Sequence, residues 1–284
     1  CAAPVNIHRI DWMWANKAVF DANGISVPTS WDELNAAAEK LQAAGIIPFA
    51  HGGQAWQDAT VFEAVAMGIG GNNYYKNCYV DLKETCLRSE TTVKVFDQMR
   101  KLQGFTDEGS PGRDWNVATG MVIEGKAGFQ IMGDWAKGEF TAAGKVPGVD
   151  YYCAATPSNN GYLYNVDSFI FYKTSDPDKQ EGQKLLAKLM MGKNFQKVFN
   201  LYKGSIPARL DVPMDEFDKC AKTSNSDIKT AGASGGLVPS FAHGMAQGNT
   251  MKAALQDVIT EHFNSDMSSV DAANALADSV LDNM

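Results

Sequence analysis

Residues 115–144, WNVATGMVIEGKAGFQIMGDWAKGEFTAAG, contain the pattern that decides the fold class. We interpret the first part of this stretch as a helix, the Gly-Lys pair after it as a turn, and AGFQIMG as a buried strand. A new helix is predicted to start at Asp134, whose carboxylate would then cap the helix N-terminus. A strand enclosed between two helices is typical of an α/β protein.

The same alternation of helix and strand continues on both sides of this stretch. Residues 30–45 predict a helix with a capping box from Ser30 to Glu33, and this helix ends at Gly45. Residues 46–50 follow as a short strand. Further strands are predicted at residues 151–156 and 166–172, and further helices at residues 91–104, 176–191, 194–202, 252–263 and 269–281.

Two other stretches complete the predicted organisation. Apolar residues recur through residues 5–14, and this pattern predicts one buried strand. Residues 224–240, SNSDIKTAGASGGLVPS, are the most loop-like part of the sequence.

Composition limits the classes of function. The chain has 284 residues, of which 45% are hydrophobic and 20% charged, so it is globular and long enough for two lobes. A net charge of −8 disfavours a nucleic acid or an anionic membrane as the main partner, and favours a neutral ligand.

The five cysteines are the next informative feature. They form no C-x-x-C pair, and none is separated from a histidine by the spacing that zinc ligands have. We therefore predict no zinc site. We favour two disulfides in an oxidising compartment over five buried thiols in the cytosol. Cys78 and Cys86 bound the short, closable loop CYVDLKETC, and Cys153–Cys220 would follow by elimination, with Cys1 unpaired. The other two connectivities of four cysteines stay open at this point.

Motifs for catalysis and for cofactors are absent from the sequence. It contains neither a G-x-x-x-x-G-K-[ST] loop nor a G-x-G-x-x-G turn, and no G-x-S-x-G elbow. A glycosidase needs two facing carboxylates, for which Asp134, Glu139 and Asp167 are the candidates. We find no catalytic constellation, and therefore predict neither an enzyme nor a cofactor.

Five polar or aromatic residues stand at the ends of predicted elements, where α/β proteins bind ligands. A Trp face packs against the C–H side of a pyranose ring, and carboxylate, amide, ammonium and imidazole groups bond to its hydroxyls. Each residue taken alone also has a structural interpretation, in the core, at a helix end or on the surface. The five candidates are Trp135, Asn165, Asp167, Lys203 and His243.

The stretch MVIEGKAGFQIMGDWA, residues 121–136, resembles the solute-binding proteins of bacterial sugar ABC transporters. Five further motifs make the sequence similar to the glucose-binding members of that family, and the resemblance covers essentially the whole chain. These motifs are PVNIHRIDWMW, AHGGQAWQDATVFEAV, GRDWNVATGMVIEGKAGFQIMGDWAK, YNVDS and FAHGMAQG.

The resemblance implies a type II periplasmic-binding-protein fold, in which two flavodoxin-like lobes joined by hinge strands close over a sugar. It also implies a periplasmic location, and the membrane subunits of an ABC transporter as partners. The same five candidates correspond to sugar ligands of the glucose-binding relatives. Gln54, Trp56 and Asp58 are weaker candidates for lining the cleft, and Asp58 would alternatively cap the helix that it precedes.

The resemblance further implies a division into lobes. Residues 1–153 and 204–284 would form the second, C-terminal lobe, and residues 154–203 a fragment of the first lobe. The N-terminal part of the first lobe would lie outside this sequence, with another chain as one source of it. The expected function is delivery of a monosaccharide, glucose or a similar hexose, to an ABC importer. The alternatives are a truncated lobe that acts only as a protein-interaction module, and a glycoside hydrolase.

Overall fold

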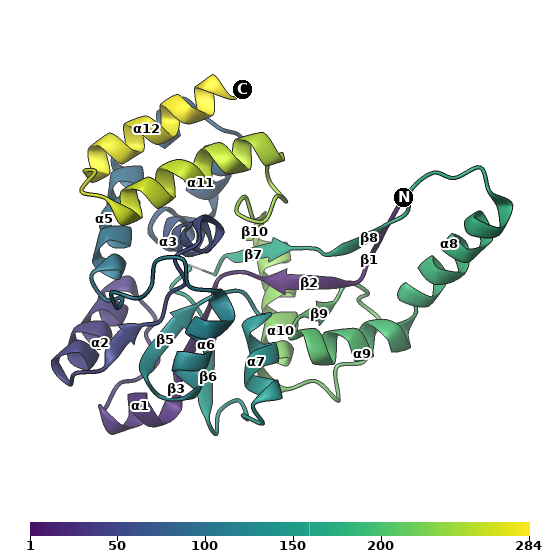
Figure 1. Cartoon of the computed structure of the whole chain (residues 1–284), viewed down its shortest axis with the longest axis horizontal. Helices are drawn as coiled ribbons and strands as arrows, with labels where there is room; N and C mark the ends of the chain where they lie inside the picture. The colour runs from purple at the N-terminus through teal and green to yellow at the C-terminus, as the bar shows by residue number, and fades with distance from the viewer. Residues whose placement is uncertain (159) are drawn as a thin grey trace.

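The computed structural model describes residues 1–158 and 160–284, which form a mixed α/β structure (Figure 1). The strands are β1 (Ala2–Pro4), β2 (Asn6–Arg9), β3 (Trp12–Asn16), β4 (Ile47–Phe49), β5 (Ala127–Ile131), β6 (Tyr151–Ala155), β7 (Tyr162–Asn165), β8 (Ser168–Ile170), β9 (Ile206–Pro207) and β10 (Leu237–Pro239). The helices are α1 (Lys17–Ala22), α2 (Trp31–Ala43), α3 (Ala55–Tyr75), the π-helical turn η1 (Lys76–Val80), α4 (Glu84–Leu87), α5 (Glu90–Gln103), α6 (Trp115–Ile123), α7 (Ala136–Ala142), α8 (Pro177–Met190), α9 (Lys193–Lys203), α10 (Lys219–Ser234), α11 (Asn249–Asn264) and α12 (Ser269–Asp282).

A four-stranded sheet in the order β4-β5-β3-β6 forms the base of the structure (Figure 1). β3 pairs antiparallel with both β5 and β6, and β4 pairs parallel with β5. Every residue of β3 is buried, so its sequence WMWAN is an apolar run rather than an alternating one. Above this sheet, α3, α5, α11 and α12 pack around Phe62 and Phe96 in the largest hydrophobic core.

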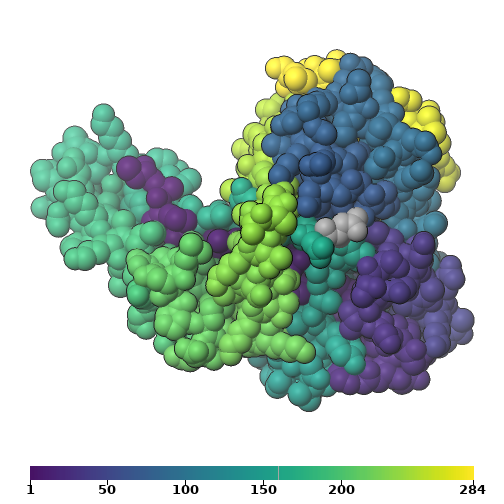
Figure 2. All heavy atoms as spheres, turned by 180° about the vertical axis from the view of Figure 1, so that it is seen from behind, coloured from purple at the N-terminus to yellow at the C-terminus, as the bar shows by residue number. Residues whose placement is uncertain are grey.

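An antiparallel ribbon leads from the body of the molecule to an outlying arm. It begins with β2 and β7, the two middle strands of a second four-stranded sheet in the order β10-β7-β2-β9, and continues as the two-stranded pair β1-β8. β2 pairs with β7, with His8 opposite Asn165, and β1 pairs with β8, with Pro4 opposite Ser168. Between the two pairs, the Val5 amide donates to the Asp167 carbonyl, so the pairing continues along the ribbon. The ribbon ends beside α8, and the space-filling view shows a hollow between this arm and the helical block (Figures 1 and 2).

The arm, which carries β8 and α8, exposes apolar side chains. Ile170 is 66% exposed and Leu185 is 61% exposed. None of the helices in the described part of the chain is long and apolar enough to cross a membrane. The predicted boundaries between lobes, at residues 153 and 204, stay a prediction.

Both predicted disulfides are confirmed. Cys78–Cys86 joins η1 to α4, and Cys153–Cys220 joins strand β6 to helix α10. Cys1 is exposed and unpaired. The predicted helix start is also confirmed, because the Ser30 hydroxyl accepts a hydrogen bond from the Glu33 amide at 3.1 Å and the Glu33 carboxylate accepts one from the Thr29 amide at 2.7 Å.

Two predictions of secondary structure were wrong. Residues 5–14 form not one strand but parts of two, β2 and β3, because the chain leaves β2 after Arg9 and enters the next sheet at Trp12. Residues 224–240 are not a loop, since most of them belong to α10 and β10. Within this stretch α10 buries Ser224 and Ala231, so small residues that look loop-like supply part of its packing face.

Candidate functional site

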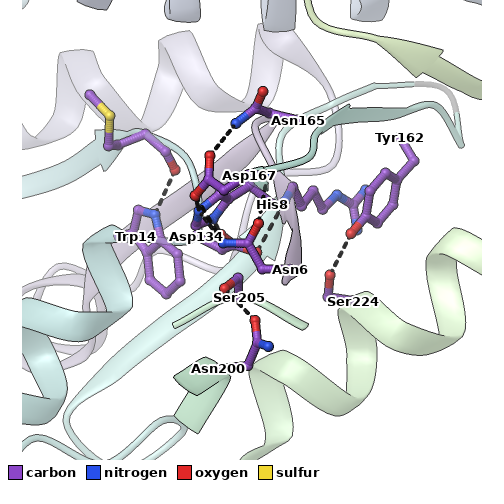
Figure 3. Close-up of polar contacts among 12 residues, drawn as sticks. Asn6, His8, Trp14, Asp134, Tyr162, Asn165, Asp167, Asn200, Ser205 and Ser224 are labelled. Carbon is purple, nitrogen blue, oxygen red and sulfur yellow. Dashed lines mark hydrogen bonds and ion pairs between the residues drawn. The ribbon is translucent and has the colours of Figure 1, made fainter. Parts of the chain in front are cut away.

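A cluster of polar side chains lies where the ribbon meets the turn after β5 (Figure 3). His8, on β2, is buried, and its ring nitrogens contact carboxylates on two other parts of the chain. Nδ1 bonds to Asp134, which follows β5, and Nε2 lies 3.0 Å from Oδ2 of Asp167, which follows β7. The Asp134 carboxylate also accepts a hydrogen bond from the Arg9 amide at 3.0 Å. Two segments far apart in sequence are therefore joined through one imidazole.

Asp167 is held by further donors from the ribbon. The Asn6 side-chain amide donates to Oδ2 of Asp167 at 3.0 Å, and the Asn165 amide donates to Oδ1 at 3.1 Å. The Asp167 side chain is nevertheless 42% exposed, so lone pairs remain for a ligand. Hydrogen bonds from His8 outweigh burial and hold the pKa of Asp167 well below its usual range, with the Lys203 ammonium adding to the effect.

The two carboxylates around His8 favour protonation of its ring. Burial opposes protonation of the ring, but the carboxylates of Asp134 and Asp167 outweigh that cost and raise the pKa of His8 above its ordinary value. The cluster therefore places the imidazole of His8 between two carboxylates.

Trp135 lies beside this cluster and is enclosed by other rings. Its ring centroid is 5.2 Å from that of His8 and 5.0 Å from that of His243, both in edge-on arrangements, and 6.3 Å from that of Trp56. Gly133 packs closely against the indole, since a Cβ built on this glycine would lie 2.2 Å from a Trp135 ring carbon. The side chain is only partly buried, which leaves part of the indole open to a ligand.

His243 lies on the loop between β10 and α11, across from Trp56. The Thr60 hydroxyl donates to the Trp56 carbonyl at 2.8 Å, and it lies 3.1 Å from Nε2 of His243. Because the single hydroxyl proton is used toward Trp56, we infer that Nε2 carries the His243 proton and that Nδ1 is an acceptor. Burial lowers the pKa of His243 to about 3, so the ring is neutral at neutral pH.

Lys203 ends helix α9 beside the turn that carries Trp135. Gly204 caps this helix with a φ of 94°, and a Cβ there would lie 2.5 Å from the Asp134 carbonyl oxygen. A glycine is therefore required for α9 to approach the turn. Lys203 itself is exposed, and its charge acts on Asp167. The structure thus brings all five predicted ligand residues to one region.

The structure places the weaker candidates differently: Trp56 lies at the site and Asp58 does not. Trp56 contacts the rings of Trp135 and His243, and its indole N–H donates to Gln54 at 2.9 Å. Asp58 does not line this region, because it is fully buried and accepts hydrogen bonds from the Thr260 hydroxyl and from His51. Asp58 also does not cap α3, since it lies inside that helix and Gln54 occupies the N-cap.

The predicted helix cap at Asp134 was also wrong. Helix α7 begins at Ala136 with Trp135 in the N-cap position, so the Asp134 carboxylate is free to turn toward His8 and Arg9. Glu139 lies within α7 and therefore follows Trp135 in the sequence, whereas Asp134 precedes it. Asp134 and Asp167 both bond to His8, so the imidazole, and not a glycosidic bond, lies between the two carboxylates that a glycosidase would use.

Comparison with known proteins now gives the family. The family model for bacterial extracellular solute-binding proteins matches residues 1–190. The chain belongs to this family. The chain is 48% identical over 280 residues to a "probable sugar-binding periplasmic protein" of Brucella suis biovar 1 (strain 1330), covering 98% of this chain and 66% of that protein. It is 45% identical over 280 residues to a protein of the same name from Rhizobium meliloti (strain 1021), covering 98% and 67%.

Solved structures confirm the fold of this solute-binding protein. The bacterial solute receptor AcbH, described as having an exclusive preference for β-D-galactopyranose, has a TM-score of 0.82 at 19% identity, over 99% of this chain and 72% of that one. The expected type II fold is therefore confirmed, and so is the periplasmic location, which the names of the relatives state. The family is one of binding proteins and not of enzymes.

The chain spans about two thirds of the length of the curated relatives that it matches, 66% and 67% in the two cases above. The expectation that another chain supplies a first-lobe segment finds no support in these comparisons.

Three residues of the site escaped the sequence-based prediction. Asn6 and His8 are two positions apart in a strand and therefore point to the same face, which was a signal available in the sequence. Their burial among apolar neighbours obscured it. Thr60 gave no such signal, because its role depends on the distant loop that carries His243.

A buried carboxyl group shapes the loop that carries His243. Glu63, on α3, accepts hydrogen bonds from the Ser240 hydroxyl at 2.6 Å and the Phe241 amide at 3.1 Å, and Ser240 in turn accepts from the His243 amide at 3.1 Å. Burial raises the pKa of Glu63 to about 7, although these hydrogen bonds oppose the shift.

We expect Glu63 to make stability depend on pH. Its folded-state pKa lies above the ordinary value, so the folded protein binds the additional proton and stability falls as pH rises toward neutral. Between about pH 5 and about pH 8 the wild type should lose about 2.5 kcal/mol of unfolding free energy that the Glu63→Gln variant keeps. Urea titrations at several pH values measure this difference, and equal pH slopes for the two proteins would contradict it.

Proposed function

We propose that this chain contributes the binding site for a monosaccharide, glucose or a similar hexose, which the protein delivers to an ABC importer. One observation supports this most directly. A partly exposed indole, that of Trp135, lies beside an ionised and partly exposed carboxylate, that of Asp167. Sugar rings need this combination, an apolar face beside strong acceptors, because they are apolar on their C–H faces and polar at their edges.

Each of the five residues has a distinct role in this proposal. Trp135 stacks on the C–H face of the pyranose, and Asp167 accepts from its hydroxyls through the lone pairs left free by His8, Asn6 and Asn165. His243 presents the neutral acceptor Nδ1. Lys203 donates from the exposed end of α9. Asn165 has a carbonyl oxygen free to accept a further hydrogen bond.

The ribbon of β1–β8 and β2–β7 provides the hinge in this proposal. It links the arm to the body, and Asn165 and Asp167 lie along it, so a bound sugar contacts the hinge itself (Figure 1). Binding then favours the closed state by the difference in sugar affinity between the open and closed states. The names of the relatives support a sugar ligand.

A titration followed by tryptophan fluorescence tests the proposed function. The folded protein, with its intact mass verified, is titrated with glucose, galactose and xylose, with glycerol as a polyol that lacks a ring. We expect a saturable change with glucose, as suits a site with several charge-assisted hydrogen bonds. No response to any of the three sugars up to about millimolar concentration would contradict the proposal.

A further inference from the structure

His8 contacts three parts of the proposed site at once. Its Nδ1 bonds to Asp134 in the turn that leads into Trp135, and its Nε2 bonds to Asp167 on the ribbon. The edge of its ring meets Trp135 with an angle of 83° between the two planes. His8 itself is buried and therefore does not stack on a ligand as Trp135 does. Figure 3 shows it between the two carboxylates.

We propose that His8 is the positioning residue of the site, and that as an imidazolium it fixes Asp167 and the Trp135 turn relative to each other. The expected effect on sugar affinity rests on the proposed function. An imidazolium donates from both nitrogens and so bonds to both carboxylates together. Charge-assisted hydrogen bonds of this kind are stronger and more directional than neutral ones. The acceptor for the sugar and the stacking surface for the sugar are then held by one group.

A neutral His8 would break this arrangement. The Asn6 amide nitrogen lies 2.9 Å from Nε2 of His8 and 3.0 Å from Oδ2 of Asp167. If Nε2 lost its proton it would accept from Asn6, and Asp167 would lose the His8 donor. The carboxylates of Asp134 and Asp167 favour the proton on His8, and burial opposes it. His243 faces the cluster as a neutral ring, and the Lys203 ammonium acts on Asp167.

The protonation of His8 is measured directly by nuclear magnetic resonance of the ¹⁵N-labelled imidazole rings, without any sugar. We expect both nitrogens of His8 to be protonated at neutral pH, where an unperturbed histidine is mostly neutral. His262, which is buried and lacks a side-chain hydrogen-bond partner among the described residues, serves as the internal comparison and should be neutral, since burial lowers its pKa to about 4. An unprotonated Nε2 on His8 would overturn the proposal.

Two isosteric variants then separate positioning from general stability. In His8→Gln the side-chain amide nitrogen replaces Nε2 and keeps a donor for Asp167, whereas in His8→Asn it replaces Nδ1 and keeps only the donor for Asp134. Both remove the charge beside Asp134, so their stabilities should fall similarly. We expect His8→Asn to weaken sugar affinity about tenfold more than His8→Gln, as loss of one charge-assisted bond predicts.

The outcomes distinguish this inference from the proposed function. Equal affinities for the two His8 variants, in folded protein, would overturn the positioning role while leaving sugar binding intact. A wild type that responds to no sugar would overturn the proposed function, and the imidazole spectra would still decide whether His8 joins the two carboxylates. The His262→Gln variant is the control, and it should keep wild-type affinity because His262 lies in α11, packed on Phe96 of α5.

Discussion

Replacing Cys153 and Cys220 together with alanine is expected to lower the free energy of unfolding by about 4 kcal/mol, on the loop-closure argument for disulfides. The two cysteines are 67 residues apart in sequence, and Cys153 lies in β6 while Cys220 lies in α10. The bond therefore restricts a long segment of the unfolded chain. It acts beside an ion pair of 2.8 Å between buried Lys137 of α7 and Asp218, the N-cap residue of α10.

The second disulfide provides a matched control for this prediction. Cys78 and Cys86 are only 8 residues apart, so the double alanine variant at these positions should lose less, about 2.5 kcal/mol, by the same loop-closure argument. Urea unfolding of both variants and the wild type, without reductant, gives the comparison. Equal losses in the two variants would show that loop closure is not the origin of the stabilisation.

The cysteines also show which features a sequence reveals. The pair at Cys78 and Cys86 was predictable because a nine-residue loop of this kind needs no knowledge of the rest of the fold. Helix α2 was predictable for the same reason, since Ser30 and Glu33 mark its start by local hydrogen bonding. Such signals act within a few residues and survive any tertiary arrangement.

Helix α10 was not predictable in this way. Its serines, its threonines and Gly232 have low helix propensity, and it forms because Cys220, Ala221 and Ala231 pack into the structure and Cys220 is bonded to β6. Tertiary contacts between segments 67 residues apart in sequence override the local preference. The break of the first predicted strand after Arg9 also has a tertiary cause, because the residues before the break pair in one sheet, as β2, and those after it in another, as β3.

The candidate site was predicted in part for a related reason. Trp135, Asp167 and His243 stand at ends of elements, where exposed polar and aromatic side chains are conspicuous in a sequence. The residue that connects them, His8, sits inside a strand and contacts Asp134 and Asp167, which lie 126 and 159 residues away in sequence. Asp58 was misassigned because helix α3 begins three residues earlier, at Ala55, and turns this side chain inward toward Thr260.

Trp135→Ala is expected to weaken sugar affinity by about a hundredfold, which corresponds to about 2.7 kcal/mol of binding free energy. The alanine removes the apolar surface on which the pyranose stacks, and aromatic side chains contribute most of the apolar contact in such sites. Isothermal titration calorimetry is the measurement, because the substitution also removes a tryptophan from the fluorescence signal. Trp135→Phe should recover part of the affinity, since a smaller aromatic face remains.

A loss in Trp135→Ala has two explanations, the missing face or a collapsed turn, and Gly133 separates them. A Cβ on Gly133 would lie 2.2 Å from the Trp135 ring, so Gly133→Ala must displace the indole without removing it. If stacking carries the affinity, Gly133→Ala should weaken binding as well, with both variants folded. Trp31→Phe, in helix α2 away from the site, should leave affinity unchanged. Wild-type affinity in Trp135→Ala would instead place the sugar elsewhere on this chain, because the indole of Trp135 is the proposed stacking surface.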